Sequence, residues 1–364
     1  MGKPGGKPWK GGNPVASAGP GPMTLSMTPL ACAALPPITG TLREAAGEEV
    51  LAKQPAGTGG HWWIRVRKDG LGTQQAREAL ARAVQRDADI VSDAGNRDRR
   101  GSFIQWFSIP ADAIDHPGPL RRAGAHNKMK VLEITNSHKP FTAAAVERIR
   151  WRLRFKDGAA DNGYLKAKNI LDHLRHHGLP NFISEDRMGV DGSWARWGRM
   201  IAEGQRLPEA VLSRGRVDAG RCLRAYQEHA FNLYLAKRLT DGQLGTVLLG
   251  DTLRSRTGVE FVAEDVAAVQ KRVDTWEAAV LGPVPGTDYL PASGDAGLRE
   301  QAWLEAEKLT SSILDRLKGG ERRALRNQPA KVQADPEGVD LVVSCELPTD
   351  VHVNVLAEEL SRPR

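Results

Sequence analysis

Two apolar-rich stretches of the chain are predicted to be β-strands. In residues 62–67 (WWIRVR), apolar and polar positions alternate from Ile64 to Arg67. In residues 103–108 (FIQWFS), Phe103, Gln105 and Phe107 would face one side and the residues between them the other. Between them, residues 74–85 repeat apolar positions at helical spacing, so we expect a helix there with Thr73 as its N-cap. The inner face of that helix is predicted to consist of Ala76, Leu80 and Val84. The pattern therefore predicts a strand, a helix and a strand in succession.

A third strand is predicted at residues 148–155 (RIRWRLRF), where basic and apolar positions alternate. One face carries Ile149, Trp151, Leu153 and Phe155, and the other carries Arg148, Arg150, Arg152 and Arg154. Burying unpaired cations is costly, so we expect the arginine face to meet solvent, acidic side chains or RNA phosphate. Further strands are predicted at 38–42, 130–134 and 338–345, and further helices at 162–177, 224–238 and 300–318.

The segment before the 103–108 strand carries the clearest chemical signal. Asp98 lies between Arg97 and Arg99, directly after a Gly95-Asn96 turn. Two adjacent cations favour the ionised form of a carboxyl group, and an ionised, positioned carboxylate can act as a nucleophile or a base. Aspartate is also common in turns, so the local sequence alone favours a structural Asp98 that caps the turn and pairs with its neighbours.

Composition narrows the choice of partner and compartment. The 364-residue chain has a net charge of +7, with 40% apolar and 26% charged residues, which is ordinary for a globular protein and permits a polyanionic partner. Its three cysteines are widely separated without a CxxC, so we expect no disulfide, no metal site and a reducing cytoplasm. No apolar run approaches the roughly 18 residues of a membrane span. Residues 1–30, rich in Gly and Pro, are predicted to be a disordered tail.

The sequence of residues 94–106, AGNRDRRGSFIQW, resembles the motif AG-x-KDR-x-A-x-T-x-QW of the TruD family of tRNA pseudouridine synthases. The positions that agree are Ala94, Gly95, Asp98, Arg99, Gln105 and Trp106. Arg97 replaces the usual Lys, and Gly101 and Phe103 replace the usual Ala and Thr. Residues 178–189, GLPNFISEDRMG, are similar to a second motif, G-x-PN-Y/F-FG-x-QRFG, at Gly178, Pro180, Asn181, Phe182, Arg187 and Gly189. The likeness continues in order from about residue 38 to residue 362.

The resemblance implies an α+β fold. It predicts a mixed, mainly antiparallel pseudouridine-synthase sheet flanked by helices, with an inserted, mostly helical TRUD domain. The pseudouridine synthase catalytic domain is expected at residues 31–183 and 320–364, and the inserted domain at residues 184–319. Together the two domains are expected to form a cleft for folded RNA.

The resemblance also implies a reaction. The expected activity is isomerisation of uridine to pseudouridine in tRNA, at position 13 of the D arm, with Asp98 as the nucleophile and no cofactor or metal. The partner is expected to be tRNA, and the protein a cytoplasmic monomer that does not enter a membrane. Contacts with RNA or the target uridine are expected from Arg97, Arg99, Gln105, Asn181 and Arg187.

Three positions at which the family places aromatic side chains near the base carry Val50, Ile183 and His352 in this chain. Stacking of an aromatic ring on a base contributes roughly 1–3 kcal/mol. Two functions therefore stay open, an active uridine isomerase and a non-catalytic RNA-binding or RNA-folding relative. Substitution of Asp98 would abolish pseudouridine formation by an active isomerase, and it would leave RNA binding by a non-catalytic relative unchanged.

Overall fold

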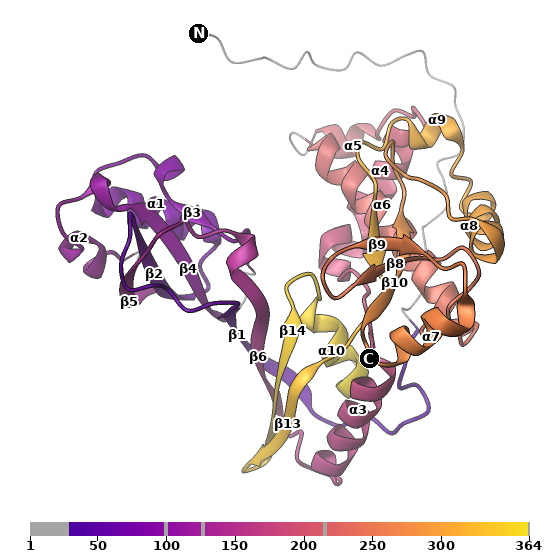
Figure 1. Ribbon diagram of the computed structural model, residues 1–364, viewed down its shortest axis with the longest axis horizontal. Helices are drawn as coiled ribbons and strands as arrows, with labels where there is room; N and C mark the ends of the chain where they lie inside the picture. Colours follow the sequence, from indigo (N-terminus) through magenta and orange to yellow (C-terminus); the bar gives the residue numbers. More distant parts are fainter. Residues whose placement is uncertain (1–28, 98–100, 125–127, 214–216, 363–364) are drawn as a thin grey trace. The chain divides into compact units, whose positions relative to one another are not determined.

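The computed structural model describes residues 29–97, 101–124, 128–213 and 217–362, and it divides into two compact units (Figure 1). Apart from Pro29, the described part of one unit is the continuous stretch Pro180–Arg326, and it is called the continuous unit below. The other, called the two-part unit below, combines Leu30–Leu179 with Asn327–Arg364. The boundaries predicted for the inserted domain, 184 and 319, lie inside the continuous unit and close to its ends. Of the predicted tail, residues 1–28 lie outside the described part of the chain.

An eight-stranded sheet forms the centre of the two-part unit. Its strands follow the order β13-β14-β6-β1-β4-β2-β5, and β3 pairs with β4. Strands β1 and β4 are parallel and the other neighbours are antiparallel, which confirms the prediction of a mixed, mainly antiparallel sheet. The strands are β1 (Thr41–Leu51), β2 (His61–Asp69), β3 (Ser92–Asp93), β4 (Ser102–Pro110), β5 (Met129–Ser137), β6 (Val146–Lys156), β13 (Ala330–Glu337) and β14 (Asp340–Pro348).

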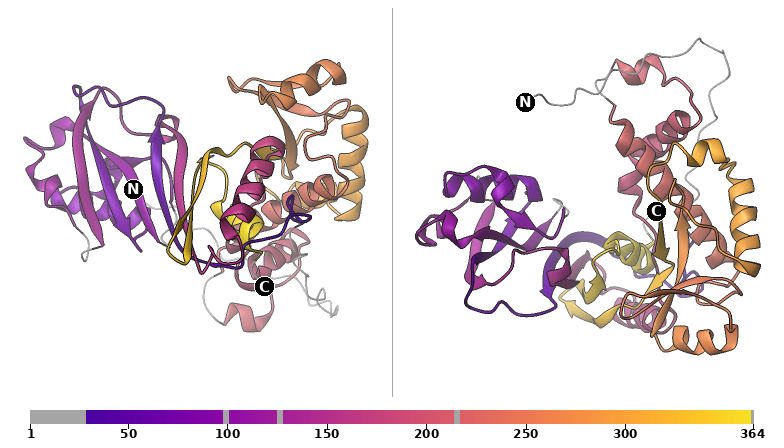
Figure 2. Two further views of the ribbon diagram at one scale, coloured as in Figure 1. Left: turned by 90° about the horizontal axis from the view of Figure 1, so that it is seen from below. Right: turned by 45° about the horizontal axis from the view of Figure 1, so that its top comes forward.

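Helices lie beside the strands at both ends of this sheet. Helices α1 and α2 lie beside β2, β4 and β5, while α3 and α10 lie beside β13 and β14 (Figure 1 and Figure 2). Helix α3 begins and ends within one residue of the helix predicted at 162–177. The helices of this unit are α1 (Thr73–Ala83), α2 (Gly118–Arg121), α3 (Gly163–His177) and α10 (Val353–Ser361).

Helix α1 packs on the β2–β4 part of the sheet through the side chains predicted for its inner face. Ala76, Leu80 and Val84 are buried there, because they form one hydrophobic cluster with Ile64, Val66, Phe107 and Ile109. The predicted N-cap was wrong, since Gly72 is the N-cap and Thr73 is the first helical residue. The Thr73 hydroxyl makes hydrogen bonds with the loop before β4 and with that strand, so it does not cap the helix.

The last segment of the chain completes the sheet. Strand β14 inserts between β13 and β6 and pairs with β6 along most of its length. In α10, the buried Glu359 carboxylate accepts hydrogen bonds from the backbone N–H groups of Ala31 (2.7 Å) and Cys32 (2.9 Å). The beginning and the end of the two-part unit are therefore held together directly.

The continuous unit combines helices with a small antiparallel sheet in the order β11-β10-β8-β9. Its strands are β8 (Thr252–Ser255), β9 (Glu260–Val262), β10 (Ala278–Val284) and β11 (Glu321–Ala324). Its helices are α4 (Ser193–Ala202), α5 (Glu209–Leu212), α6 (Ala219–Thr240), α7 (Val266–Asp274), α8 (Gly294–Ala306) and α9 (Ser311–Leu314). The single helix predicted at 300–318 was wrong, because the chain turns after α8 with Lys308 at φ +54° before α9 begins. Every helix in the described part of the chain is too short or too polar to cross a lipid bilayer.

Candidate active site

The loop that leads into β4 is described up to Arg97, whereas Asp98 and Arg99 lie outside the described residues. Two hydrogen bonds fix the turn at Gly95. The Gly95 N–H donates to Asp93 Oδ1 (2.7 Å), and Gln105 Nε2 donates to the Gly95 carbonyl (2.9 Å). Because Gln105 comes from the middle of β4, this second bond ties the turn to the sheet.

The hydroxyl of Thr73 connects the loop with α1, β2 and β4. It accepts from the backbone N–H of Arg97 (2.9 Å) and from Lys68 Nζ (3.3 Å), and it donates to Gln105 Oε1 (3.0 Å). Thr73 is buried and Gln105 is 0% exposed. The predicted contact of Gln105 with RNA would therefore require its side chain to leave these bonds, and in this structure it positions the loop.

The guanidinium of Arg97 binds a buried carboxylate. Arg97 Nε donates to Glu49 Oε1 (2.9 Å), and the second oxygen of Glu49 accepts from the backbone N–H of Trp106 (2.8 Å). Burial raises the pKa of the Glu49 carboxyl, and the charge of Arg97 opposes that rise. The Arg97 side chain is only 12% exposed, so it faces the protein rather than an RNA phosphate.

Lys68 adds a buried cation behind the loop. Its side chain comes from β2 and is 1% exposed, its ammonium lies 3.5 Å from the carbonyl oxygen of Arg97, and it stands 5.6 Å from the centre of the Phe103 ring. Its positive charge therefore lies close to the residue that precedes Asp98. The sequence contains one sign that Lys68 is buried. It follows the buried Ile64 and Val66 at intervals of two residues, so it lies on the same face of β2 as they do.

Gly101 holds the other end of the loop. It adopts φ +88°, and a Cβ built on it would lie 2.2 Å from the carbonyl oxygen of Ala45. Its own carbonyl accepts from the N–H of Gly70 (3.0 Å). The family motif has Ala at this position, and this backbone favours Gly because a side chain would be strained and would meet the β1 backbone.

The arginine face of β6 is paired with acidic side chains, which was one of the predicted outcomes. These ion pairs join Arg150 to Glu346 (2.8 Å), Arg152 to Glu337 (2.6 Å) and Arg154 to Asp340 (3.2 Å). These three acids come from β13 and β14, at one end of the sheet, and Arg150 also pairs with Glu48 of β1 (3.5 Å). Much of the positive charge of this face is therefore neutralised within the protein.

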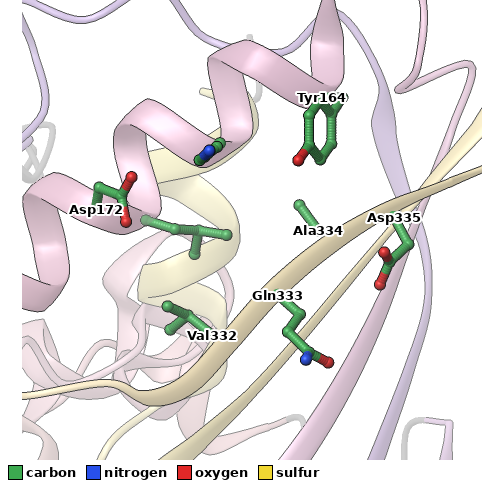
Figure 3. A pocket seen from close by; sticks show the side chains of 8 residues that line it. Tyr164, Asp172, Val332, Gln333, Ala334 and Asp335 are labelled. Carbon is green, nitrogen blue, oxygen red and sulfur yellow. The ribbon is translucent and has the colours of Figure 1, made fainter.

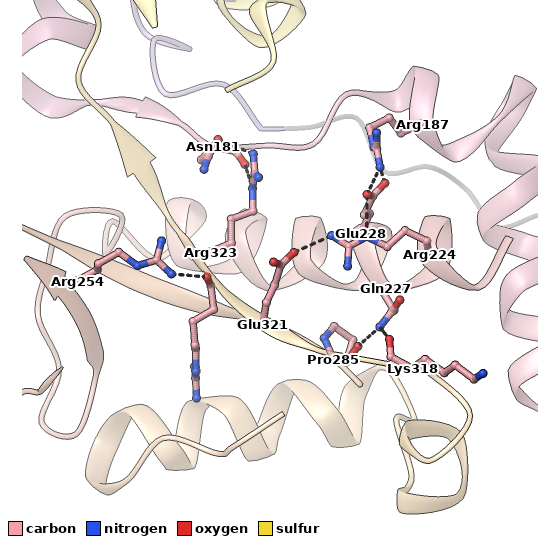
Figure 4. Close-up of polar contacts among 11 residues, drawn as sticks. Asn181, Arg187, Arg224, Gln227, Glu228, Arg254, Pro285, Lys318, Glu321 and Arg323 are labelled. Atoms are coloured by element: carbon pink, nitrogen blue, oxygen red, sulfur yellow. Dashed lines mark hydrogen bonds and ion pairs between the residues drawn. The ribbon is translucent and has the colours of Figure 1, made fainter. Parts of the chain in front are cut away.

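The two predicted residues of the second motif lie in the continuous unit. Asn181 is 0% exposed, its Oδ1 accepts from Arg323 (2.7 Å), and its Nδ2 donates to the carbonyl of Ala324 (3.0 Å) (Figure 4). Arg187 lies in the 3₁₀ helix Glu185–Met188 and is half exposed. The structure thus places Gln105 and Arg97 in one unit and Asn181 and Arg187 in the other.

The positions at which the family has aromatic side chains differ in accessibility. Ile183 is buried, and the side chain of Asn232 bonds both its N–H (2.9 Å) and its carbonyl (2.8 Å). Val50 and His352 are partly exposed. Trp106 of the first motif is buried in the core of its unit.

A groove of about 310 Å³ lies between α3 and β13, and none of the predicted site residues lines it (Figure 3). Two carboxylates and one ammonium line it, so its charge does not favour a polyanion. Its lining consists of Tyr164, Lys168, Leu171, Asp172, Val332, Gln333, Ala334 and Asp335. Among the described residues, no group of three or more His, Cys, Asp or Glu side chains is placed to hold a metal ion.

The chain is similar to known proteins along nearly its whole length. Residues 28–211 and 222–360 match the family described as "tRNA pseudouridine synthase D (TruD)". The chain is 33% identical over 351 residues to tRNA pseudouridine synthase D of Anaeromyxobacter dehalogenans strain 2CP-C, which covers 92% of this chain and 96% of that protein. It is 28% identical over 318 residues to tRNA pseudouridine synthase D of Stutzerimonas stutzeri strain A1501, covering 86% and 89% of the two.

The fold is similar to a crystal structure assigned as tRNA pseudouridine synthase D (TruD) from Methanosarcina mazei. The TM-score is 0.71 at 17% sequence identity, and the match covers 93% of this chain and 97% of that one. At this identity the likeness bears on the arrangement of helices and strands alone.

Proposed function

Because the chain belongs to the TruD family of tRNA pseudouridine synthases, it is an isomerase that acts on tRNA, and we propose that Asp98 is its nucleophile. We also propose that its target is uridine 13 in the D arm. The observation that carries the proposal for Asp98 is the network that holds Arg97, the residue directly before it.

This network holds Arg97 by its backbone and by its side chain. Thr73 binds the Arg97 N–H and Glu49 binds the guanidinium, so Arg97 is held at both its backbone and its side chain. The ammonium of Lys68 bonds the Arg97 carbonyl at 3.5 Å. Positive charge close to a carboxyl group favours the carboxylate, which is the form that a nucleophile needs.

In the proposed reaction, the Asp98 carboxylate attacks the flipped uridine at either the uracil ring or the ribose carbon. The N1–C1′ glycosidic bond breaks, the base turns over, and a C5–C1′ bond forms. The proton on C5 is released, N1 gains a proton, and the bond to Asp98 is broken again. Substrate and product are isomers, so the reaction needs no net oxidant or reductant, and we propose that it uses neither a cofactor nor a metal.

The other predicted residues receive separate roles in this proposal. Arg97 and Arg99 keep Asp98 ionised, and Gln105 fixes the turn before it. In the continuous unit, Arg187 supplies an exposed guanidinium for RNA, and Asn181 acts through the Arg323 side chain that it binds. Recognition would then rely on RNA shape and backbone more than on base sequence.

We propose that the protein works as a cytoplasmic monomer. Its three cysteines, Cys32, Cys222 and Cys345, are free thiols, and all three are buried. Free thiols persist in a reducing compartment, which fits the cytoplasm.

The test is pseudouridine mapping of total RNA from cells with and without the gene, complemented with wild type, Asp98→Asn or Asp87→Asn. Asp87 is an exposed aspartate of the same unit and serves as the matched control. We expect the mark at position 13 to disappear without the gene and to return with wild type and Asp87→Asn only. Purified Asp98→Asn is expected to bind tRNA as wild type does.

Two results would contradict the proposal in different ways. Return of the mark with Asp98→Asn would exclude Asp98 as the nucleophile. Loss of pseudouridine at a position other than 13 would keep the activity and overturn the assigned target.

A further inference from the structure

Two arginines of the continuous unit share one buried carboxylate. Glu228 lies in α6 with its side chain 3% exposed, and Arg224 lies one turn earlier in the same helix. Arg187 comes from the 3₁₀ helix Glu185–Met188. Arg187 Nε donates to Glu228 Oε2 (2.8 Å) and its Nη2 to Oε1, while Arg224 Nε donates to Oε1 (3.1 Å) (Figure 4). Charge-assisted bonds of this kind fix the orientation of both guanidinium groups.

Both fixed guanidinium groups also reach the surface. The side chains of Arg187 and Arg224 are 49% and 42% exposed. Each guanidinium has five N–H donors, and within the described part of the chain each of these two uses two of them in hydrogen bonds. Exposed guanidinium groups held in a fixed orientation match the oxygens of a phosphate.

Glu321 is the second acid of this cluster and differs from Glu228 in its exposure. Its side chain is 52% exposed, and its Oε1 accepts from Arg224 Nη2 at 2.6 Å. Exposed ion pairs of this kind are weak, so another anion can replace Glu321 at little cost. Once Glu321 is displaced, Arg187, Arg224 and Glu228 together carry a charge of about +1, which favours an incoming anion.

We propose that Arg187 and Arg224, held by Glu228, bind a backbone phosphate of the substrate tRNA, and that Glu321 occupies the place of that phosphate in the free protein. This inference rests on the proposed function, because it takes tRNA as the ligand. Glu228 is a positioning residue here, since it contacts the arginines and not the RNA. We call Arg187, Arg224, Glu228 and Glu321 the phosphate clamp.

The first test compares two substitutions with opposite expected effects on binding of an unmodified tRNA transcript. Arg224→Gln is expected to weaken binding about tenfold, the effect of losing a hydrogen bond to a charged group. It should also reduce the slope of log affinity against log salt by roughly 0.7 to 0.9, the contribution of one phosphate. Glu321→Gln is expected to tighten binding about threefold, because the competing carboxylate is removed.

Arg206→Gln is the matched control, since Arg206 is an exposed arginine of the same unit that also pairs with a glutamate, Glu209. It is expected to leave both the affinity and the salt slope unchanged. The clamp is refuted when Arg224→Gln binds tRNA as Arg206→Gln does, or when Glu321→Gln fails to tighten binding. Because Glu321 is exposed, we expect Glu321→Gln to fold. Its effect on binding therefore tests the clamp even when Arg224→Gln fails to fold.

The second test addresses the positioning role of Glu228. Glu228→Gln and Arg187→Gln are each expected to raise KM for tRNA about tenfold with kcat retained at saturating tRNA. The double variant should bind no more weakly than the weaker of the two single variants, because Glu228 acts through Arg187. Additive losses, or a fall in kcat with Glu228→Gln, would overturn this role.

Failure of the clamp can be told apart from failure of the proposed function. Wild-type protein that forms no pseudouridine in the transcript refutes the proposed function, whatever Arg224→Gln does. Wild-type activity together with unchanged binding by Arg224→Gln refutes the clamp alone.

Discussion

The Thr73 hydroxyl joins the loop before β4 to three other elements, and Thr73→Val removes it while keeping the shape of the side chain. The substitution deletes bonds from the Arg97 N–H (2.9 Å) and Lys68 Nζ (3.3 Å) and the bond to Gln105 Oε1 (3.0 Å). Because Thr73 is buried, water does not readily replace these bonds. We therefore expect the variant to loosen the chain that leads into Asp98.

The size of this effect follows from the kinds of bond that are lost. The two neutral bonds contribute about 1 kcal/mol each, and the bond from the Lys68 ammonium contributes about 2 kcal/mol. Bonds that share an atom are not additive, so we expect a loss of about 2–4 kcal/mol. A rise of about 1.4 kcal/mol in the activation free energy slows a reaction tenfold. When the whole loss is added to the activation free energy, pseudouridine formation therefore slows about 30-fold to 1000-fold.

The assay is single-turnover pseudouridine formation in an unmodified tRNA transcript, with binding of the transcript measured in parallel. Thr73→Ser is the matched control, because it keeps the hydroxyl and loses only a methyl group. We expect Thr73→Ser to react at nearly the wild-type rate and both variants to bind tRNA normally, since the side chain is buried. Equal rates for the Val and Ser variants would refute the reasoning that the hydroxyl positions the loop.

Three further predictions concern stability and charge. Gly47→Ala should lower the free energy of unfolding by about 1–3 kcal/mol in urea, because the added Cβ would lie 2.4 Å from the Phe103 ring; an unchanged urea midpoint would contradict this. Arg152→Gln should weaken tRNA binding no more than about twofold, since Arg152 is already paired with Glu337 at 2.6 Å; a tenfold loss would show that it contacts RNA. Burial lowers the pKa of His229 to about 4, below the unfolded value of 6.5. The neutral imidazole therefore makes its full contribution to the free energy of unfolding above pH 6.5, and this contribution is lost as pH falls toward 4. Urea unfolding at pH 7.5 and pH 5 should therefore differ by about 2 kcal/mol more for wild type than for His229→Gln, and equal differences would contradict the assignment.

Strand β4 could be predicted because it is rich in aromatic and β-branched residues, although residues 105–109 are buried on both faces of the strand. Helix α1 could be predicted because its buried positions repeat at helical spacing. The same reasoning failed for residues 300–318, where apolar spacing continues past the end of α8. The chain turns at Lys308 with positive φ, and a lysine gives no sign of that conformation in the sequence. Strand β13 was missed because it is an edge strand with mostly polar residues and a proline, which leaves little apolar alternation.

The motifs selected the residues of the candidate site, but the sequence did not tell which of them are buried and bond protein atoms. Gln105 and Asn181 were expected to face RNA, yet both are fully buried and bond protein atoms. A polar residue type alone does not tell whether its partner is RNA or protein. Glu49 and Glu228 were missed for the same reason, because a buried carboxylate is recognised only once its arginine partner is placed beside it.

The arginine face of β6 has a consequence for how the chain is made on the ribosome. Glu44 and Glu48 of β1, which also pair with this face, are synthesised before it. The other acidic partners, Glu337, Asp340 and Glu346, belong to β13 and β14, which are synthesised after residues 180–326 have emerged and could fold as the continuous unit. Until then, the edge of β6 that will bind β14 is open to other chains. Charged side chains on an unpaired strand discourage pairing with a strand of another chain. The arginines of β6 would therefore keep nascent chains apart until β14 pairs with β6.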